Sequence, residues 1–282
     1  MTDSRADIRA DSRADTTSGH GDPFELLRLA VRAAEAAGEL LLEGISRSRT
    51  NVATKTTATD MVTEMDLAAE ALVVATVLAE RPGDAFLAEE GSAPTPPAGA
   101  PVTWVVDPLD GTTNYLYGFP SWAVSIAAEV DGAAVAGVVY DPTHGEVFTG
   151  VAGQGAWCNT HPLRLGPPPV LPSALVATGF GYDPGRRAEQ AATLACVLPT
   201  VRDVRRAGAA SLDLCWVAAG RVDAYYERGL QPWDWAAGTL IAAEAGATLS
   251  TLPDGTMVAA AVPLHQSLVE LLLACGCHQA AG

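Results

Sequence analysis

The chain has 282 residues, of which 49% are hydrophobic, and a formal net charge of −16. This composition supplies a substantial core and excludes a disordered polymer. The negative charge argues against nucleic acid or an anionic membrane as a partner. No segment reaches the roughly 18 uninterrupted apolar residues of a membrane span, and the N-terminus lacks the order of residues typical of a signal peptide. We therefore expect a cytoplasmic protein.

The cysteines support the same expectation. Their number is odd, and no two of them have CxxC spacing. They are Cys158, Cys196, Cys215, Cys275 and Cys277. Such a set fits reduced cytosolic thiols better than a disulfide framework. We therefore expect these side chains to be free thiols.

The first part of the chain begins with a polar tail. Residues 1–22 contain a duplicated Asp-Ser-Arg-Ala-Asp pentad and bury too little surface to order themselves. A strong helix start at Asp22-Pro23 predicts a helix to about residue 44, and a second helix is expected from Thr63 to about Arg81. An Asp131-Gly132 hairpin joins two of the strands, which are expected at 85–88, 102–106, 122–129, 133–140 and 146–151.

Strands and helices alternate in the second part. Strands are expected at 174–179, 202–205 and 222–226, with a short β pair near 248–258, and helices at 186–197, 210–219, 234–245 and 265–274. This mixture predicts an α/β (α+β) fold with layered sheets between helices. We expect one domain over 23–282, with a boundary between its halves, 23–166 and 170–282, at the Pro167-Pro168-Pro169 break.

The most informative segment is Trp104-Val-Val-Asp107-Pro-Leu109-Asp110-Gly111-Thr112-Thr113-Asn114. It reads as an apolar strand that ends in a turn with two carboxylates three residues apart. Mg²⁺ binds through one or two carboxylates together with phosphate oxygens. The turn offers both carboxylates and the Leu109 carbonyl to a metal, and it leaves the Gly111 and Thr112 amides for a phosphate if a helix starts there. Pro-x-Asp-Gly is also an ordinary turn sequence.

Other charged residues fall into the same scheme. Asp66 is expected in the first turn of a helix, Glu89 and Glu90 just past a short strand, Glu227 after another strand, and Asp234 at a helix start. Each alone could be a helix-dipole charge or part of a solvated loop. Together they bring several carboxylates to strand ends and helix starts, where the active sites of layered α/β folds collect.

Lys55 is the only lysine among the 17 basic residues. Lysine is a compact point charge that suits a carboxylate or a metal-bound water, and arginine does not replace it there. A single lysine can also survive by chance.

With these residues the chain resembles the inositol monophosphatase family of Mg²⁺-dependent, lithium-sensitive phosphatases. The resemblance covers the chain from about Asp22 to the end. One signature is similar to Asp107-Pro-Leu-Asp110-Gly-Thr-Thr-Asn114 with Phe119-Pro, and another to Trp233-Asp234-x-Ala236-Ala-Gly238. The resemblance implies the layered α-β-α-β-α sandwich of the inositol monophosphatase and sugar phosphatase type. It also implies a phosphatase activity and a homodimer.

The resemblance also implies a metal site with two or three Mg²⁺ ions. Glu89, Asp107 and the Leu109 carbonyl would hold the first ion. Asp107, Asp110 and Asp234 would hold the second, so that Asp107 bridges the two. Two metal ions about 4 Å apart activate water on one side and stabilise the leaving oxygen on the other.

The remaining roles concern water and substrate. Thr112 and Glu89 would orient or deprotonate the attacking water, and the Gly111 and Thr112 amides would bind the phosphate beside Asp110 and Asp234. Glu227, with Ala210 beside it, would receive a hydroxyl of the alcohol. Lys55 and Asp66 would surround the metals and their waters. No Gly-x-Ser-x-Gly elbow, P-loop lysine or HExxH motif supports another hydrolase class.

The chain departs from the family pattern at a few positions. Ala88 stands where a glycine is frequent, and we expect alanine to be tolerated if its φ is negative. Ala209 replaces a serine or threonine and removes a hydroxyl near the substrate, which leaves the alcohol specificity open. Thr160 replaces a turn glycine, with a local effect only.

We expect inositol 1-phosphate or a similar polyol phosphate as substrate, since Thr-Thr-Asn after Gly111 resembles this branch of the family rather than the nucleotidases. Histidinol phosphate is the first alternative, because Glu227 could hold its ammonium group, and fructose 1,6-bisphosphate is a further one. A noncatalytic partner-binding protein is the alternative from another class.

Overall fold

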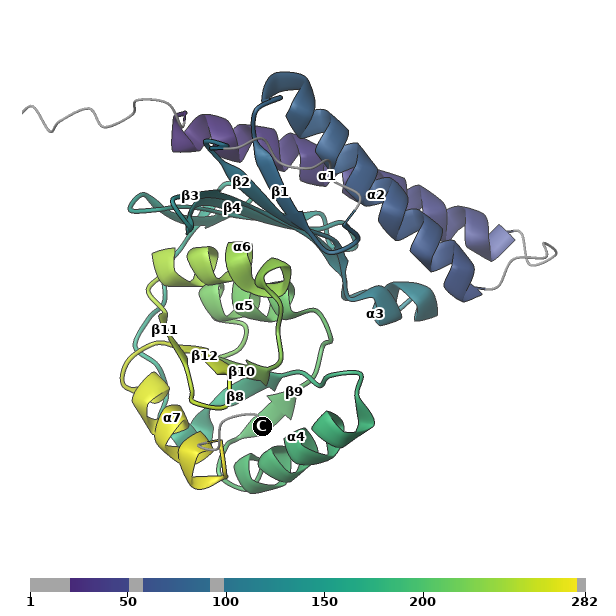
Figure 1. The fold of residues 1–282 in the computed structure, drawn as a ribbon. Coiled ribbons are helices and arrows are strands. Elements are labelled where there is room, and N and C mark those ends of the chain that lie inside the picture. The colour runs from purple at the N-terminus through teal and green to yellow at the C-terminus, as the bar shows by residue number, and fades with distance from the viewer. Residues whose placement is uncertain (1–20, 51–57, 92–98, 278–282) are drawn as a thin grey trace, which may run out of the picture.

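Helices and sheets alternate in five layers, which Figure 1 shows from top to bottom. The computed structural model describes residues 21–50, 58–91 and 99–277. Helices α1 (Pro23–Thr50) and α2 (Ala58–Glu80) form the first layer, α5 (Ala210–Ala218) and α6 (Pro232–Glu244) the third, and α4 (Pro184–Val197) and α7 (Leu264–Ala274) the fifth. The two sheets lie between these helical layers, which confirms the predicted α-β-α-β-α fold.

The first sheet has seven strands in sequence order, of which only the β1–β2 pair is parallel. Its strands are β1 (Ala85–Ala88), β2 (Thr103–Asp110), β3 (Ala123–Val130), β4 (Ala133–Asp141), β5 (Glu146–Val151), β6 (Gly155–Cys158) and β7 (His161–Leu163). Asp131 and Gly132 have φ of 51° and 78° and join β3 to β4. Positive φ at both central residues is the conformation of a two-residue hairpin turn, as predicted.

The first sheet is buried on both faces, and the side chains of β2 alternate between them. Trp104 and Val106 pack with α1 and α2, whereas Val105 packs with α5 and α6. A period of two residues is what a strand with two covered faces requires. The ends of this strand are therefore fixed from both sides.

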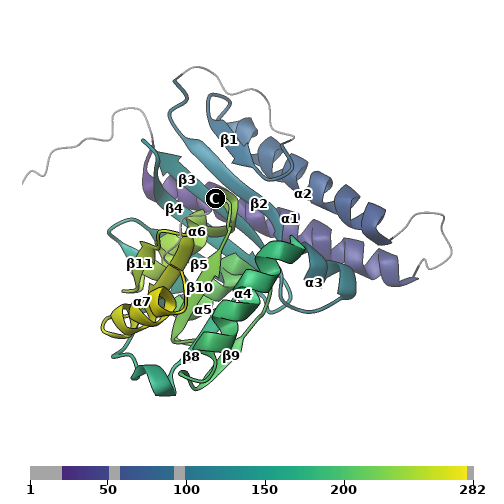
Figure 2. The same ribbon diagram turned by 60° about the horizontal axis from the view of Figure 1, so that its bottom comes forward.

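The second sheet has five strands in the order β11-β12-β10-β8-β9. They are β8 (Leu175–Thr178), β9 (Asp203–Arg205), β10 (Ala224–Arg228), β11 (Thr248–Thr251) and β12 (Thr256–Ala260). One face packs with α5, and the other packs with α4 and α7. Figure 2 shows the molecule from the side of these outer helices. None of the described helices is long and apolar enough to cross a membrane.

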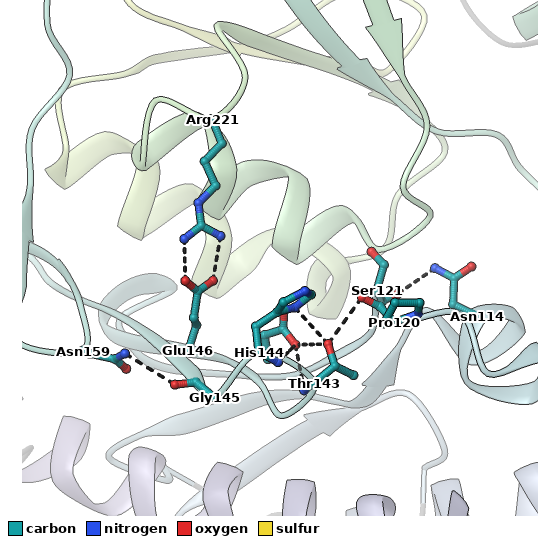
Figure 3. A network of polar contacts seen from close by, with 10 residues as sticks. Asn114, Pro120, Ser121, Thr143, His144, Gly145, Glu146, Asn159 and Arg221 are labelled. Atoms are coloured by element: carbon teal, nitrogen blue, oxygen red, sulfur yellow. Dashed lines mark hydrogen bonds and ion pairs between the residues drawn. The ribbon is translucent and has the colours of Figure 1, made fainter.

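Two polar contacts tie the sheets together. Arg221, which precedes β10, donates from Nη1 to Glu146 Oε2 of β5 at 2.6 Å. Asn114 donates from Nδ2 to the Ser121 carbonyl at 2.6 Å and to the Ala207 carbonyl at 2.8 Å. Figure 3 shows the first contact and the Asn114–Ser121 contact. The short helix α3 (Thr112–Tyr117) after β2 and the loop before α5 are thereby held together.

Several predicted boundaries shift. Helix α2 begins at Ala58, so Asp66 lies more than two turns inside it and not in its first turn. Strand β2 continues through Asp110 instead of ending near Val106. The patterns did not predict the short elements α3 (Thr112–Tyr117), η1 (Leu171–Ser173), β6 and β7. The predicted tail lies outside the described residues, except for its last two, and the domain boundaries stay a prediction.

The expectation that all cysteines are free is wrong. Cys196 of α4 and Cys275, just past α7, form a disulfide bond with Cα atoms 5.9 Å apart. The two helices cover the same face of the second sheet and pack against each other, which brings together residues 79 positions apart. Spacing in sequence cannot reveal such a pair. Cys158, Cys215 and Cys277 are free thiols, as expected.

Candidate active site

Most of the predicted site residues line one cavity between the two sheets. The cavity has a volume of about 270 Å³. It is lined by Glu89, Asp107, Leu109, Asp110, Gly111, Thr112, Ala210, Glu227 and Asp234. Asp66 lies outside this lining, and Lys55 lies outside the described residues.

A β-bulge aims two of these acids into the cavity. In a regular strand, residues three apart point to opposite faces of the sheet. Asp107 pairs with Ser125 and Asp110 with Ala123, so β2 carries one extra residue between the two pairs. A bulge of this kind redirects side chains. Asp107 and Asp110 therefore both line the cavity.

Each of these two carboxylates is held by hydrogen bonds. Asp107 Oδ1 accepts from the Leu109 amide at 3.0 Å. Asp110 Oδ2 accepts from both the Ser211 amide, at 2.8 Å, and the Ser211 hydroxyl, at 2.5 Å. Ser211 belongs to α5, so the contact fixes Asp110 against the second half of the chain.

Glu89 follows β1 and is backed by two acids of α2. Asp66 and Glu70 are one helical turn apart and both are buried. Glu70 Oε2 accepts from the Glu90 amide at 2.7 Å and so holds the loop after β1. Asp66 Oδ1 has no hydrogen-bond partner. Burial, together with the charges of Glu89, Glu90 and Glu70, raises the pKa of Asp66 to about 8.

Gly111 and Thr112 form the start of α3. Gly111 has φ of 92°, which favours glycine, and a Cβ atom there would lie 2.9 Å from the Ser121 carbonyl oxygen. The first amides of a helix have no partner within it. The helix start that was the condition for phosphate binding by these two amides is therefore present. The Thr112 hydroxyl donates to the Leu109 carbonyl at 3.1 Å.

Glu227 and Asp234 approach the cavity from β10 and α6. The Tyr225 hydroxyl donates to Glu227 Oε2 at 2.8 Å. A Cβ atom at Gly179 would lie 1.9 Å from the same oxygen, so a glycine there leaves room for the carboxylate. Asp234 Oδ2 accepts from the Gln231 amide at 2.6 Å and caps α6. Asp234 is therefore both a helix cap and a cavity residue.

Burial is the main cause of the raised pKa values of these acids, and repulsion between them adds to it. Burial, with the charge of Glu89 next in effect, raises the pKa of Asp107 well above its usual range. Burial raises the pKa of Asp110 to about 7 against the opposing hydrogen bonds from Ser211. Burial also raises the pKa of Glu89 and of Glu227 to about 7. Such mutual repulsion at buried carboxylates indicates a site built to receive positive charge.

A divalent metal fits the chemistry of this donor set, which offers carboxylate oxygens and one carbonyl. As the side chains stand, no three or more of the described histidine, cysteine, aspartate and glutamate side chains converge on a single metal position. Glu89 and Asp107 nevertheless interact, since burial raises the pKa of Glu89 while its contact with Asp107 lowers it.

Comparison with known sequences decides the family. The profile of the inositol monophosphatase family matches residues 22–274. The chain belongs to this family. The inositol-1-monophosphatase of Mycobacterium leprae is 48% identical over 236 residues, covering 78% of this chain and 81% of that protein. The Nus factor SuhB of Escherichia coli K12 is 40% identical over 235 residues, covering 82% and 86%.

Solved structures of family members have the same fold. Mycobacterium tuberculosis SuhB superposes with a TM-score of 0.80 at 41% identity, covering 92% of this chain and 99% of that one. The inositol monophosphatase of Anabaena superposes with a TM-score of 0.77 at 34% identity, covering 89% and 96%. Family membership and these relatives identify the chain as a phosphatase.

The patterns missed several residues that shape the site. Glu70 was detectable, because it follows Asp66 by one helical turn on the same face. Ser211 and Tyr225 had no comparable signal, since each acts through a contact between distant parts of the chain. Arg186 and Arg206 also line the cavity and were not predicted. Ala88 is absent from the described non-glycine residues with positive φ, which meets the stated condition for alanine there.

Proposed function

We propose that this phosphatase hydrolyses inositol 1-phosphate, or a similar polyol phosphate, with the help of Mg²⁺. The observation that carries the proposal is that one cavity is lined by two different groups of residues. Asp107, Asp110 and the start of α3 lie on one side, where a phosphate and its metals would bind. Glu227 and Ala210 lie on the other, suited to the hydroxyls of an alcohol.

The metal ligands follow from the donor atoms in the cavity. Asp107, Asp110, Glu89, Asp234 and the carbonyl of Leu109 would hold two or three Mg²⁺ ions. When bound, such ions supply charge neutralisation of the phosphate and lower the pKa of water. Asp110 has one oxygen engaged by Ser211, and Asp234 has one engaged by the cap of α6, so each has its other oxygen for this purpose.

The chain's own residues would bind and orient the reactants. The Gly111 and Thr112 amides would donate to phosphate oxygens, and the Thr112 hydroxyl with Glu89 would orient the attacking water. The cavity lining contains no serine, cysteine or histidine among the described residues. Aspartate can also form a covalent phosphoenzyme, but the aspartates of this lining would be engaged by the metal ions. We therefore expect direct attack by water, since phosphoryl transfer needs mainly positioning and electrostatic stabilisation.

Other readings receive less support. A histidinol phosphate substrate would place an ammonium group in a cavity that already holds Arg186 and Arg206. A partner-binding role is suggested by relatives named Nus factor SuhB. The acids of the cavity have no use in such a role. A homodimer in the cytoplasm, without nucleic acid or membrane partners, completes the proposal.

The test is phosphate release from inositol 1-phosphate, histidinol phosphate and adenosine 3′,5′-bisphosphate, each with and without Mg²⁺. We expect Mg²⁺-dependent, lithium-sensitive release with a preference for the inositol ester. Preference for histidinol phosphate would change the proposed substrate, whereas the roles assigned to the residues of the site would stay the same. No release from any ester would contradict the proposed function.

A further inference from the structure

Two arginines of the cavity differ from their neighbours in forming no ion pair at contact distance, although burial raises the pKa values of Glu227 and Asp213 and the charge of Arg206 lowers them. Arg186 and Arg206 line the cavity, and within the described residues neither side chain forms an ion pair or a hydrogen bond. The other arginines between positions 180 and 230 all have a polar partner: Arg187 with the Tyr182 carbonyl, Arg202 with the Ser173 carbonyl, Arg205 with Asp203, Arg221 with Glu146 and Arg228 with Glu189.

The chain as a whole makes this absence informative. It has 33 acidic and 17 basic residues, so an arginine has an excess of carboxylates to choose from. Among the described arginines, Arg164 also forms no ion pair or hydrogen bond but lies away from this cavity, whereas the guanidinium groups of Arg186 and Arg206 lie at the same one. Solvation of an exposed arginine is common, but it does not explain why these two share one location.

Glycines make room for both side chains. A Cβ atom at Gly229 would lie 2.5 Å from Arg186 Nη1, and one at Gly208 would lie 2.3 Å from Arg206 Nη1. Gly181 is similarly close to Arg186, at 3.1 Å from its Cδ. The two guanidinium groups therefore lie against the bare backbone of glycines at the edge of the cavity.

A further contact orients Arg206. Its Cζ atom lies 5.9 Å from the centre of the Phe180 ring, within the range of a cation–π contact. Phe180 also lines the cavity. This contact orients the guanidinium but does not neutralise its charge, so its N–H groups stay available for an anion.

We propose that Arg186 and Arg206 form a subsite for a second phosphate group, carried by the alcohol part of the substrate. The inference rests on the proposed function, in which the first phosphate binds at the acidic side of the cavity. Arginine is the residue best suited to phosphate, because its planar group donates two parallel hydrogen bonds. The preferred substrates would then be polyol bisphosphates, with inositol 1-phosphate a simpler and weaker one.

The kinetic test compares inositol 1,4-bisphosphate with inositol 1-phosphate in the presence of Mg²⁺. We expect kcat/KM to be about tenfold higher for the bisphosphate. Arg206→Gln and Arg186→Gln are expected to bring the ratio of kcat/KM between the bisphosphate and the monophosphate close to one. Arg205→Gln is the matched control, since Arg205 neighbours Arg206 in sequence, is exposed, and pairs with Asp203 instead of lining the cavity.

A binding test separates the subsite from the chemistry. Calorimetry with Mg²⁺ and the non-hydrolysable phosphonate analogues of the same two esters would measure their affinity for the parent protein and the three variants. Tighter binding of the bisphosphate that is lost in Arg186→Gln and Arg206→Gln, but kept in Arg205→Gln, supports the subsite even if no ester is hydrolysed. Hydrolysis of inositol 1-phosphate combined with equal binding of both analogues would overturn the subsite and leave the proposed function intact.

Discussion

The two sides of the cavity are built in different ways. On the acidic side, Asp107 and Asp110 belong to a strand buried on both faces, and Asp66 and Glu70 support Glu89 from α2. On the other side, Glu227, Arg186 and Arg206 are accommodated by glycines in loops and at strand ends. We infer that the doubly buried strand fixes the shared chemistry, whereas the glycine-lined contacts of Glu227, Arg186 and Arg206 set which alcohol is accepted.

The largest expected effect comes from the acidic side. Asp107→Asn removes the carboxylate that would bridge the metals, and we expect Mg²⁺-dependent turnover to fall by about a thousandfold or more. The fold is expected to persist, because asparagine also relieves repulsion with Glu89 and Asp110. Phosphate release together with circular dichroism checks this. Turnover near the parent level would remove the bridging role.

The disulfide lies on the face of the second sheet that points away from the cavity. Its removal tests whether the stability of the protein can change without a change in turnover. Replacing Cys196 and Cys275 by serine is expected to lower the free energy of unfolding by about 2–4 kcal/mol. The turnover number is expected to change little, because neither cysteine lines the cavity. Urea denaturation measures the stability, with Cys158→Ser as a free-thiol control. An unchanged midpoint would mean that the cross-link contributes nothing.

Glu227→Gln tests the alcohol side. The neutral amide is nearly isosteric, and we expect it to change the ratio of kcat/KM between polyol esters by about tenfold to a hundredfold. Metal affinity is expected to stay nearly constant, because Glu227 is not among the predicted ligands. Mg²⁺ titration of turnover with two esters provides the measurement. A loss confined to Mg²⁺ affinity would instead place Glu227 on the acidic side.

The smallest expected effect is on the pH dependence of the metal-free protein. Glu89 and Asp66 have folded-state pKa values raised to about 7 and about 8, so the folded state holds protons that the unfolded chain releases near pH 4. Stability therefore falls as the pH rises through this window, and it is higher at about pH 5 than at about pH 8.

Thermal melts across this range, with and without Mg²⁺, test the sign. We expect Mg²⁺ to raise the melting temperature more at the higher pH, where it no longer competes with protons. Asp66→Asn is expected to flatten the metal-free profile. A melting temperature of the metal-free protein that rises toward pH 8 would show that the pKa values of these acids are not raised in the folded state.

Sequence patterns by themselves predicted the layered fold, most helices and strands, and the acids of the cavity. They succeeded because a strand buried on both faces and a capped helix leave local signals, as in Trp104–Val106 and Asp22-Pro23. The family signatures added the expected roles of Asp107, Asp110 and Asp234 as metal ligands, whereas their positions at a turn and at a helix start were already visible in the patterns.

Only the tertiary structure decided the rest. The bulge that turns Asp107 and Asp110 to one side depends on the pairing of β2 with β3. The disulfide depends on the packing of α4 with α7, and the two unpaired arginines are recognisable only once every neighbouring carboxylate has a position. Local propensity acts over a few residues, whereas these features arise from contacts between segments tens of residues apart, and such contacts leave no periodic trace in a single sequence.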